Sequence, residues 1–273
     1  MWRRSGGFAL LIVLWTLVLI AFIVARMTAS GRTEIRIAGN LVADAAAVAA
    51  DDGAIYSAIF NQLDPSPDQR WPLNGPAREL TIGSSRVMLQ IEDEAGRINP
   101  STASPVVLEA LLRTTGSDPE SAHRLAAAIG EWVGSAVAAR PRDAVLADYR
   151  AAGLDYSPPG EALETLDELS RVLGMTPAVV AAIRPHLTLY GPPEPNPASA
   201  DPVVAAALAT IPQLSQALVP GGIQPPPDLL LLRITATAFG PSNARVKRQA
   251  VVRVGPMLPG GYGVLAWGAS TFD

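Results

Sequence analysis

The chain has 273 residues, of which 49% are hydrophobic, so it is long enough to bury a core in one or two domains. Its net charge is −4 and Lys247 is its only lysine, so it lacks the clustered basic face that is typical of nucleic-acid binding. Cysteine is absent, which excludes disulfides, cysteine-based metal sites and cysteine nucleophiles.

An apolar segment near the N-terminus is the first predicted element. Phe8 to Ala25 contain no charged residue, and a helix of this length spans about 27 Å, close to the hydrocarbon thickness of a bilayer. A cleaved signal peptide is disfavoured, because the apolar stretch is long and Met27 stands where a cleavage site needs a small residue. A plain membrane anchor stays open as the simplest interpretation.

A second interpretation rests on the residues directly before this segment. A short basic leader that ends in Gly7, followed by Phe8 and an unbroken apolar helix, resembles the leader of type IV pilins and type II secretion pseudopilins. The resemblance implies that a prepilin peptidase cuts after Gly7, methylates the new amine of Phe8, and leaves the C-terminal body in the periplasm. Charge alone does not decide the orientation, because arginines lie on both sides of the segment: Arg3 and Arg4 before it, Arg26, Arg32 and Arg36 after it.

The helix is predicted to continue beyond the membrane to about Asn61, where Pro65 and Pro67 end it. Its apolar residues recur at steps of three and four: Ala38, Leu41, Ala45, Val48, Ile55 and Ile59. The pair Asp51-Asp52 is interpreted as helix surface. One long helix, half in lipid and half packed on a globular body, is therefore expected.

Two groups of strands are predicted, separated by a long helical region. The strands are expected at 78–82, 86–91, 232–238, 245–254 and 263–267, with a hairpin turn at 239–243. Helices are expected at 105–114, 118–133, 144–151, 165–173, 176–186 and 202–209. Because strands lie on both sides of the helices, we expect an α+β fold in which a helical domain is inserted into an antiparallel sheet.

This order of elements, together with three local strings, resembles the general secretion pathway protein K family of type II secretion. The strings are Asp93-Glu-Ala-Gly-Arg-Ile-Asn99 at the start of the helical region, Glu164-Thr-Leu-Asp-Glu-Leu169 with Leu173-Gly-Met-Thr-Pro177, and Asn40-Leu-Val-Ala43 in the long helix. The resemblance implies a type IV pilin-like fold with a large all-α insertion similar to SAM or helix-hairpin-helix modules. The implied domains are a cleaved leader (1–7), a transmembrane half-helix (8–25), a periplasmic helix half with the first strands (26–97), the insertion (98–218) and the returning strands (219–273).

The function implied by the resemblance is that of a non-enzymatic minor pseudopilin at the tip of the pseudopilus, supporting protein export across the outer membrane. The protein would be a single-pass inner-membrane protein with a periplasmic body. Its implied partners are the I- and J-type minor pseudopilins, the major pseudopilin and the prepilin peptidase, with exported substrates and the outer-membrane secretin as further candidates. No nucleic acid is expected among them.

One substitution within the apolar segment agrees with a tip position. Most pilins carry a glutamate at the fifth residue of the mature chain, where it is thought to pair with the free amine of the neighbouring subunit. Counting from Phe8, that residue is Ile12, which makes no such pair. A subunit with nothing above it needs none, although ordinary membrane hydrophobicity is the better explanation of Ile12 when this residue is taken alone.

A metal site known from the family is depleted in this sequence. Relatives commonly bind Ca²⁺ through a run of aspartates after an Asp-Trp pair, and the matching stretch here begins at Glu131-Trp132. Two of those aspartates are replaced by Gly134 and Ala136, and a later glutamate by Val145. Because Ca²⁺ takes roughly six to eight oxygen ligands, the remaining carboxylates are too few to assign a site, and we expect no cofactor. These carboxylates are Glu131, Asp143 and Asp148.

No catalytic pattern is found in the sequence. His123 and His186 lack a paired-ligand spacing and are interpreted as structural, and the cluster Glu92-Asp93-Glu94 is interpreted as a solvated turn. The alternatives that stay open are a type IV pilus minor pilin and a membrane-anchored DNA-binding protein of the helix-hairpin-helix type. The second rests on 98–112 and 174–177, but the insertion contains many carboxylates, scattered arginines and no lysine.

Overall fold

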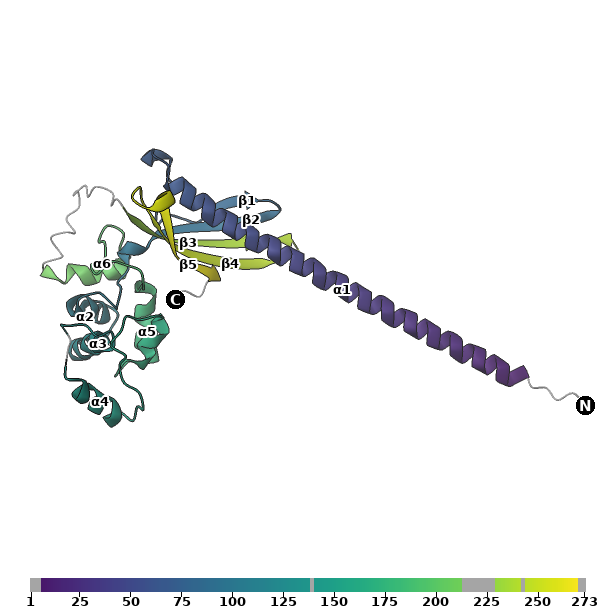
Figure 1. Cartoon of the computed structure of the whole chain (residues 1–273), viewed down its shortest axis with the longest axis horizontal. Coiled ribbons are helices and arrows are strands. Elements are labelled where there is room, and N and C mark those ends of the chain that lie inside the picture. The colour runs from purple at the N-terminus through teal and green to yellow at the C-terminus, as the bar shows by residue number, and fades with distance from the viewer. Residues whose placement is uncertain (1–5, 138–139, 213–228, 242–243, 270–273) are drawn as a thin grey trace, which may run out of the picture.

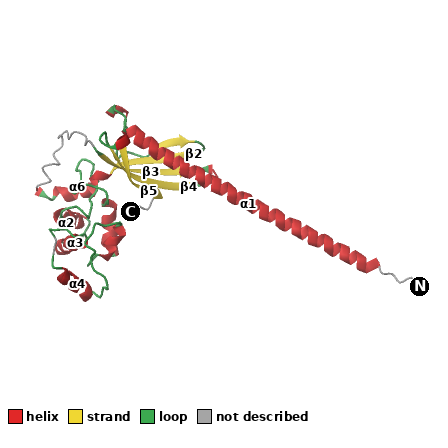
Figure 2. Cartoon of the chain, viewed as in Figure 1, coloured by secondary structure: helices red, strands yellow, loops and turns green. Residues whose placement is uncertain are grey.

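The computed structural model describes residues 6–137, 140–212, 229–241 and 244–269. It consists of a long N-terminal helix, a five-stranded sheet on which the end of that helix packs, and a helical domain at the end of the sheet that lies away from the N-terminus (Figure 1). Helices and strands are segregated into these separate parts, as the colouring by secondary structure shows (Figure 2). The predicted α+β class with a helical region is confirmed.

Helix α1 runs without interruption from Gly6 to Gln62, so its 57 residues extend over about 85 Å. It ends one residue beyond the predicted end, and Asn61 closes the turn that follows by accepting a hydrogen bond from the backbone N–H of Trp71 at 2.6 Å. Only its last third packs on protein, through small and branched apolar residues spaced by three and four positions. These residues are Ala43, Ala47, Ala50, Ala54, Ile55, Ala58 and Ile59.

The sheet has five antiparallel strands in the order β1-β2-β3-β4-β5. The strands are β1 (Arg78–Ile82), β2 (Ser85–Asp93), β3 (Leu230–Phe239), β4 (Arg245–Val254) and β5 (Tyr262–Ala269). Alternate residues of β2, among them Val87, Leu89 and Ile91, face α1 and form one core with it and with β3 and β4. The pairing of β2 with β3 joins the two predicted strand groups across the whole insertion.

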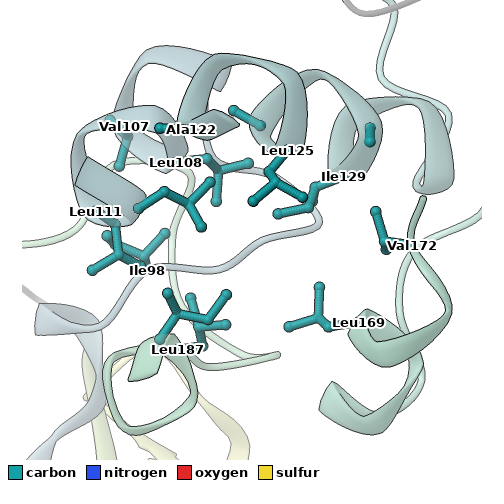
Figure 3. Packing of buried hydrophobic residues seen from close by; sticks show 14 of the residues in the cluster. Ile98, Val107, Leu108, Leu111, Ala122, Leu125, Ile129, Leu169, Val172 and Leu187 are labelled. Atoms are coloured by element: carbon teal, nitrogen blue, oxygen red, sulfur yellow. The ribbon is translucent and has the colours of Figure 1, made fainter. Parts of the chain in front are cut away.

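The insertion has a core of its own. Its helices are α2 (Pro105–Thr114), α3 (Pro119–Trp132), α4 (Arg142–Ala151), α5 (Pro177–Ile183) and α6 (Pro202–Ala209). Side chains from α2 and α3 meet those of the following segments in one apolar cluster, which Figure 3 shows around Leu111, Ile129, Leu169 and Leu187. The insertion is therefore a packed domain and not an extended loop.

The helix predictions for 105–114 and 202–209 have the observed bounds, and two others are wrong in type or extent. The segment expected as a helix at 165–173 is a 3-10 helix, Leu166–Arg171. The helix expected at 176–186 ends at Ile183 and continues as a 3-10 turn, because Pro185 has no N–H for the next α-helical hydrogen bond. The boundary expected at 218/219, the residues 1–5 of the leader and the turn residues Ser242 and Asn243 lie outside the described residues.

Candidate functional site

The first third of α1 has the properties of a membrane span. Leu10–Met27 is the one described segment that is long and apolar enough to cross a bilayer, and none of it is buried against the rest of the protein. Residues such as Leu10, Trp15 and Phe22 expose more than half of their surface. A solvent-facing surface of this kind costs free energy in water, so the segment needs lipid or another apolar helix around it.

The predicted processing residues lie at the start of this span. Gly7 and Phe8 belong to the first turns of α1, which begins at Gly6. Ile12 is half exposed and lies within the apolar segment Leu10–Met27. The structure thus places the three residues on one helix end, and their roles in processing and assembly remain predictions.

Beyond the span, α1 exposes several large apolar side chains, interspersed with Glu34 and Arg36, before it reaches the sheet. Ile35, Ile37, Leu41 and Val42 are each more than half exposed, whereas Ala43 is the first residue that the sheet body buries. Because these side chains are large and apolar and have no covering layer in the described protein, this stretch offers a packing surface for other helices.

Where α1 packs on the sheet, it carries a buried carboxylate. Asp51 is fully buried, and neither of its carboxylate oxygens accepts a hydrogen bond of normal geometry from the described residues. Burial, with the charge of Asp52, raises its pKa from 3.8 to about 7, although the guanidinium of Arg248 and the backbone N–H of Ala238 act in the opposite direction. The interpretation of Asp51 as helix surface is therefore wrong. Only Asp52 is partly exposed, and it pairs with Arg248 at 2.8 Å and accepts from the indole of Trp267 at 3.0 Å.

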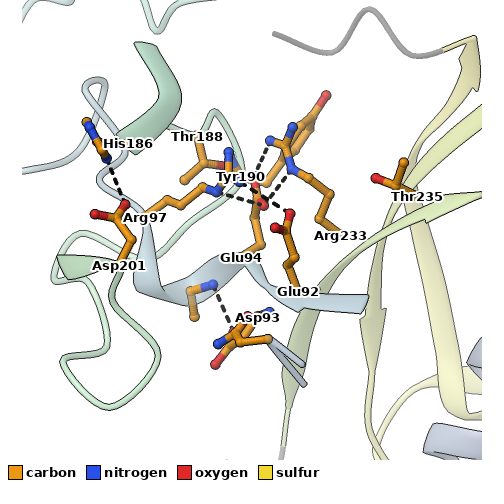
Figure 4. Close-up of polar contacts among 12 residues, drawn as sticks. Glu92, Asp93, Glu94, Arg97, His186, Thr188, Tyr190, Asp201, Arg233 and Thr235 are labelled. Atoms are coloured by element: carbon orange, nitrogen blue, oxygen red, sulfur yellow. Dashed lines mark hydrogen bonds and ion pairs between the residues drawn. The ribbon is translucent and has the colours of Figure 1, made fainter. Parts of the chain in front are cut away.

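A second buried charge lies where the insertion leaves the sheet. Glu94 is completely buried and accepts hydrogen bonds from Nε and Nη2 of Arg233 on β3, the first at 2.7 Å (Figure 4). Arg97 adds a longer contact to the same carboxylate at 3.7 Å. The interpretation of Glu92-Asp93-Glu94 as a solvated turn is therefore wrong for Glu94, which ties the exit of the insertion to the strand by which the chain returns.

The rest of the Asp93–Asn99 string closes the neck of the insertion. Ile98 pairs with Leu187 in an isolated parallel bridge, and the side-chain amide of Asn99 donates to the carbonyls of Leu189 and Gly191. A Cβ at Gly96 would lie 2.3 Å from the carbonyl oxygen of Ser199, so only glycine fits there. The string thus holds the start and the end of the insertion together.

The predicted carboxylate cluster of the insertion is arranged around an arginine. Nη1 of Arg140 lies 3.1 Å from Glu131 and its Nη2 lies 2.7 Å from Asp148, whereas no ion pair of Asp143 is seen in the described protein. Within the described residues, no three acidic or histidine side chains come together as a metal site. Asp143 is thus not brought together with the other two carboxylates.

Both histidines lie in structural pairs, as interpreted from the sequence. Nδ1 of His123 is 2.9 Å from Glu109, and Nδ1 of His186 is 2.8 Å from Asp201, the N-cap of α6. Sequence reasoning missed the role of Arg233, although a lone arginine within the apolar run 229–234 was a signal for a buried ion pair.

Comparison with known proteins agrees with this architecture. Residues 88–193 match the family model of type II secretion system protein K. A chain in the crystal structure of the GspK-GspI-GspJ complex, from the type 2 secretion system of enterotoxigenic Escherichia coli, is 15% identical, with a TM-score of 0.55 over 88% of this chain and 98% of that chain. Comparison with curated proteins gives no match.

Proposed function

We propose that the chain is a minor pseudopilin at the tip of the secretion pseudopilus, because residues 88–193 match the family model of type II secretion system protein K and its fold is similar to a chain of the GspK-GspI-GspJ complex. The observation that carries the proposal is the division of α1. Its first third is wholly exposed and apolar, its last third packs on a sheet, and the bulky insertion lies at the far end of that sheet (Figure 1). Such a subunit is a structural component of the secretion system, and its work is assembly.

The surface for assembly is the free length of α1. The span places the N-terminal third among lipids or neighbouring helices, and the exposed stretch with Ile35, Ile37, Leu41 and Val42 extends the apolar surface toward the body. The partners proposed for it are I- and J-type minor pseudopilins and the major pseudopilin. Support comes from the similar structure, which contains GspI and GspJ together with GspK.

The tip position follows from Ile12 and from the insertion. Ile12 leaves the apolar helix without a carboxylate for the amine of a subunit above, and an unpaired charge in lipid costs several kcal/mol. The amine of Phe8, freed by cleavage after Gly7, stays available to a carboxylate on the subunit that arrives below. The insertion adds a domain with five α-helices beside one end of the sheet, which would collide with neighbours within a helical filament.

Processing is tested by mass spectrometry of the protein recovered from membranes. The mature chain should begin at N-methylated Phe8, and Gly7→Asp should leave unprocessed precursor, because a side chain there crowds the peptidase site. Gly6→Asp is the matched control and should still be processed. An intact Met1, or a start near Ser30, in functional protein would exclude the pseudopilin function.

Assembly is tested by single-cysteine crosslinking, for which the cysteine-free chain is suited. Leu41→Cys should crosslink to I- or J-type partners, whereas Ala47→Cys, buried under the sheet, should not. Immunogold labelling should place the protein at one end of each filament. Labelling along the whole length, or unchanged filament number and length after deletion, would contradict the tip position.

A DNA-binding role for the insertion is disfavoured by its charges. Several of its arginines lie in ion pairs with carboxylates, such as Arg124 with Glu120 and Arg184 with Asp167, and this pairing lowers the positive charge that they present to a phosphate backbone. A salt-dependent DNA-binding assay should detect no binding. A type IV pilus role differs in its phenotype, since deletion would then impair piliation and leave protein secretion intact.

A further inference from the structure

The Ca²⁺ site implied by the family can be tested against the side chains present. Ca²⁺ needs roughly six to eight oxygen ligands, mostly from carboxylates and carbonyls. The two carboxylates that do converge, those of Glu131 and Asp148, already share one cation, because the guanidinium of Arg140 donates one N–H to each. The residues present therefore do not fit the metal: the position between the carboxylates is filled by a side chain of the chain itself.

The two ion pairs of Arg140, with Glu131 and with Asp148, are called the Arg140 bridge below, and they connect α3 to α4. Glu131 is at the end of α3 and its side chain is only 7% exposed, whereas Asp148 belongs to α4. The residues that follow each carboxylate, Trp132 and Tyr149, stack in the interior with ring centroids 6.4 Å apart. The contact between α3 and α4 is therefore made by these aromatic rings in the interior and by Arg140 at the surface.

Close to Glu131, the backbone at Gly134 packs directly against the backbone at Gly160. Gly134 has a φ of +70°, and a Cβ at this position would lie 2.4 Å from the carbonyl oxygen of Gly160. The N–H of Gly160 donates to the carbonyl of Trp132 at 3.0 Å. The connection after α3 is thus held against the 157–160 segment, close to Glu131, and the positive charge of Arg140 offsets the repulsion between Glu131 and Asp148.

We propose that Arg140 is a built-in cation that replaces a bound metal, so that the insertion holds α3 and α4 together without Ca²⁺. Arginine suits this task because its guanidinium is always charged and its planar fork reaches two carboxylates at once, which lysine does not do. The contacts with Asp148 and Glu131 raise the pKa of Arg140 further, so its charge is permanent at any physiological pH. Assembly of this subunit would then be independent of the Ca²⁺ supply of its compartment.

The test is thermal unfolding of the full chain in detergent, followed in the insertion by hydrogen exchange. The melting temperature of the wild type should be the same with millimolar Ca²⁺ and with a chelator, because ligand binding to the folded state would raise it. Arg140→Met should lower it by roughly 2–4 °C, as for loss of a partly exposed ion-pair network. Arg124→Met is the matched control, since Arg124 pairs with the single exposed carboxylate of Glu120, and it should have almost no effect.

A second variant tests whether the Arg140 bridge needs the planar fork of arginine. Arg140→Lys keeps the positive charge but loses the planar fork, and its melting temperature should lie between those of the wild type and of Arg140→Met. The proposal is overturned if Ca²⁺ stabilises the wild type, if Arg140→Met costs no more than Arg124→Met, or if Arg140→Lys is as stable as the wild type. None of these outcomes depends on where the subunit lies in the filament.

Discussion

The sheet body, formed by α1 and β1–β5, and the insertion, described over residues 98–212, differ in where their buried charges lie. The sheet body buries Asp51 under α1, and the Glu94–Arg233 pair is buried where the sheet meets the insertion, whereas the pair of Arg86 with Glu79 is exposed. The insertion keeps its ion pairs at the surface, as with Arg140, and fills its interior with apolar and aromatic side chains.

The two regions also differ in how far along the chain their contacts reach. β2 ends at Asp93 and its partner β3 begins at Leu230, whereas α2 and α3 pack on each other as direct neighbours. The fully buried carboxylates Asp51 and Glu94 thus lie where segments distant in the sequence meet, whereas each described ion pair within the insertion has at least one partly exposed member. Substitution of a buried charge should therefore destabilise the sheet body and its junction with the insertion. Truncation of a buried apolar side chain should destabilise only the region that contains it.

The largest effect is expected at the junction. Arg233→Met leaves the buried carboxylate of Glu94 without its main partner, so the free energy of unfolding should fall by about 3–5 kcal/mol. Urea unfolding measures the loss, and Arg86→Met, which removes an exposed pair with Glu79, is the control and should cost little. A loss at Arg233 as small as that of the control would show that the junction does not depend on this pair.

Truncation of one buried side chain in each core tests whether the two cores unfold independently. Ile129→Ala in α3 and Ile234→Ala in β3 each remove a buried side chain, and each should cost about 2–5 kcal/mol. Hydrogen exchange should show that Ile129→Ala weakens protection in the insertion, while Ile234→Ala weakens it in the sheet and in the end of α1. Equal loss of protection in both regions from either change would mean that they unfold as one unit.

The pH dependence of stability should also differ between the sheet body, which contains Asp51, and the insertion. Because the pKa of Asp51 is raised on folding from 3.8 to about 7, the folded state binds this proton more tightly, and the contribution of Asp51 to stability is greatest below about pH 4. It should fall as pH rises toward 7, with a slope of at most about 1.4 kcal/mol per pH unit, and level off above that. Urea unfolding between pH 4 and 8 measures this slope in the sheet body.

Asp51→Asn should remove this slope and stabilise the sheet body at pH 8, since the buried charge is gone. Asp44→Asn is the matched control on an exposed position of α1 and should keep the slope. A wild-type sheet body whose stability rises from pH 4 to pH 7 would contradict the raised pKa, because the sign of the linkage would be reversed.

The smallest effect is expected at a helix end of the insertion. The hydroxyl of Ser104 accepts the N–H of Val107 at the start of α2, and Ser104→Ala should cost about 1 kcal/mol. Hydrogen exchange should place the change in the first turn of α2 and leave the sheet unaffected. A response in β2 or β3 would show that the neck transmits strain from the insertion into the sheet.

Much of the secondary structure could be predicted from local patterns. The bounds of α2 and α6 follow from Ser104 and Asp201, which are N-caps before a proline at the first helical position. The 3-10 segment Leu166–Arg171 was missed, because its capping box is the same signal that begins an α-helix, and only the surrounding packing limits its length.

The polar residues of the site were less predictable than the elements that carry them. Asp51 follows the helical period onto the buried face, but charge pattern alone assigns an aspartate pair to the surface. Glu94 and Arg140 find their partners at Arg233, Glu131 and Asp148, and sequence spacing does not indicate which carboxylate meets which arginine.

By itself, then, the sequence determined the membrane-length apolar helix, the strand groups on both sides of a helical region, and the absence of cysteine and clustered lysine chemistry. These follow from properties of neighbouring residues: hydrophobic period, caps, prolines and composition. Only the tertiary structure decided that Asp51 is buried, that Glu94 pairs with Arg233, and that Arg140 lies between two carboxylates. The physical reason is that burial and ion pairing depend on distances in space, and β2, β3 and the ends of the insertion approach each other only when the sheet closes around the inserted domain.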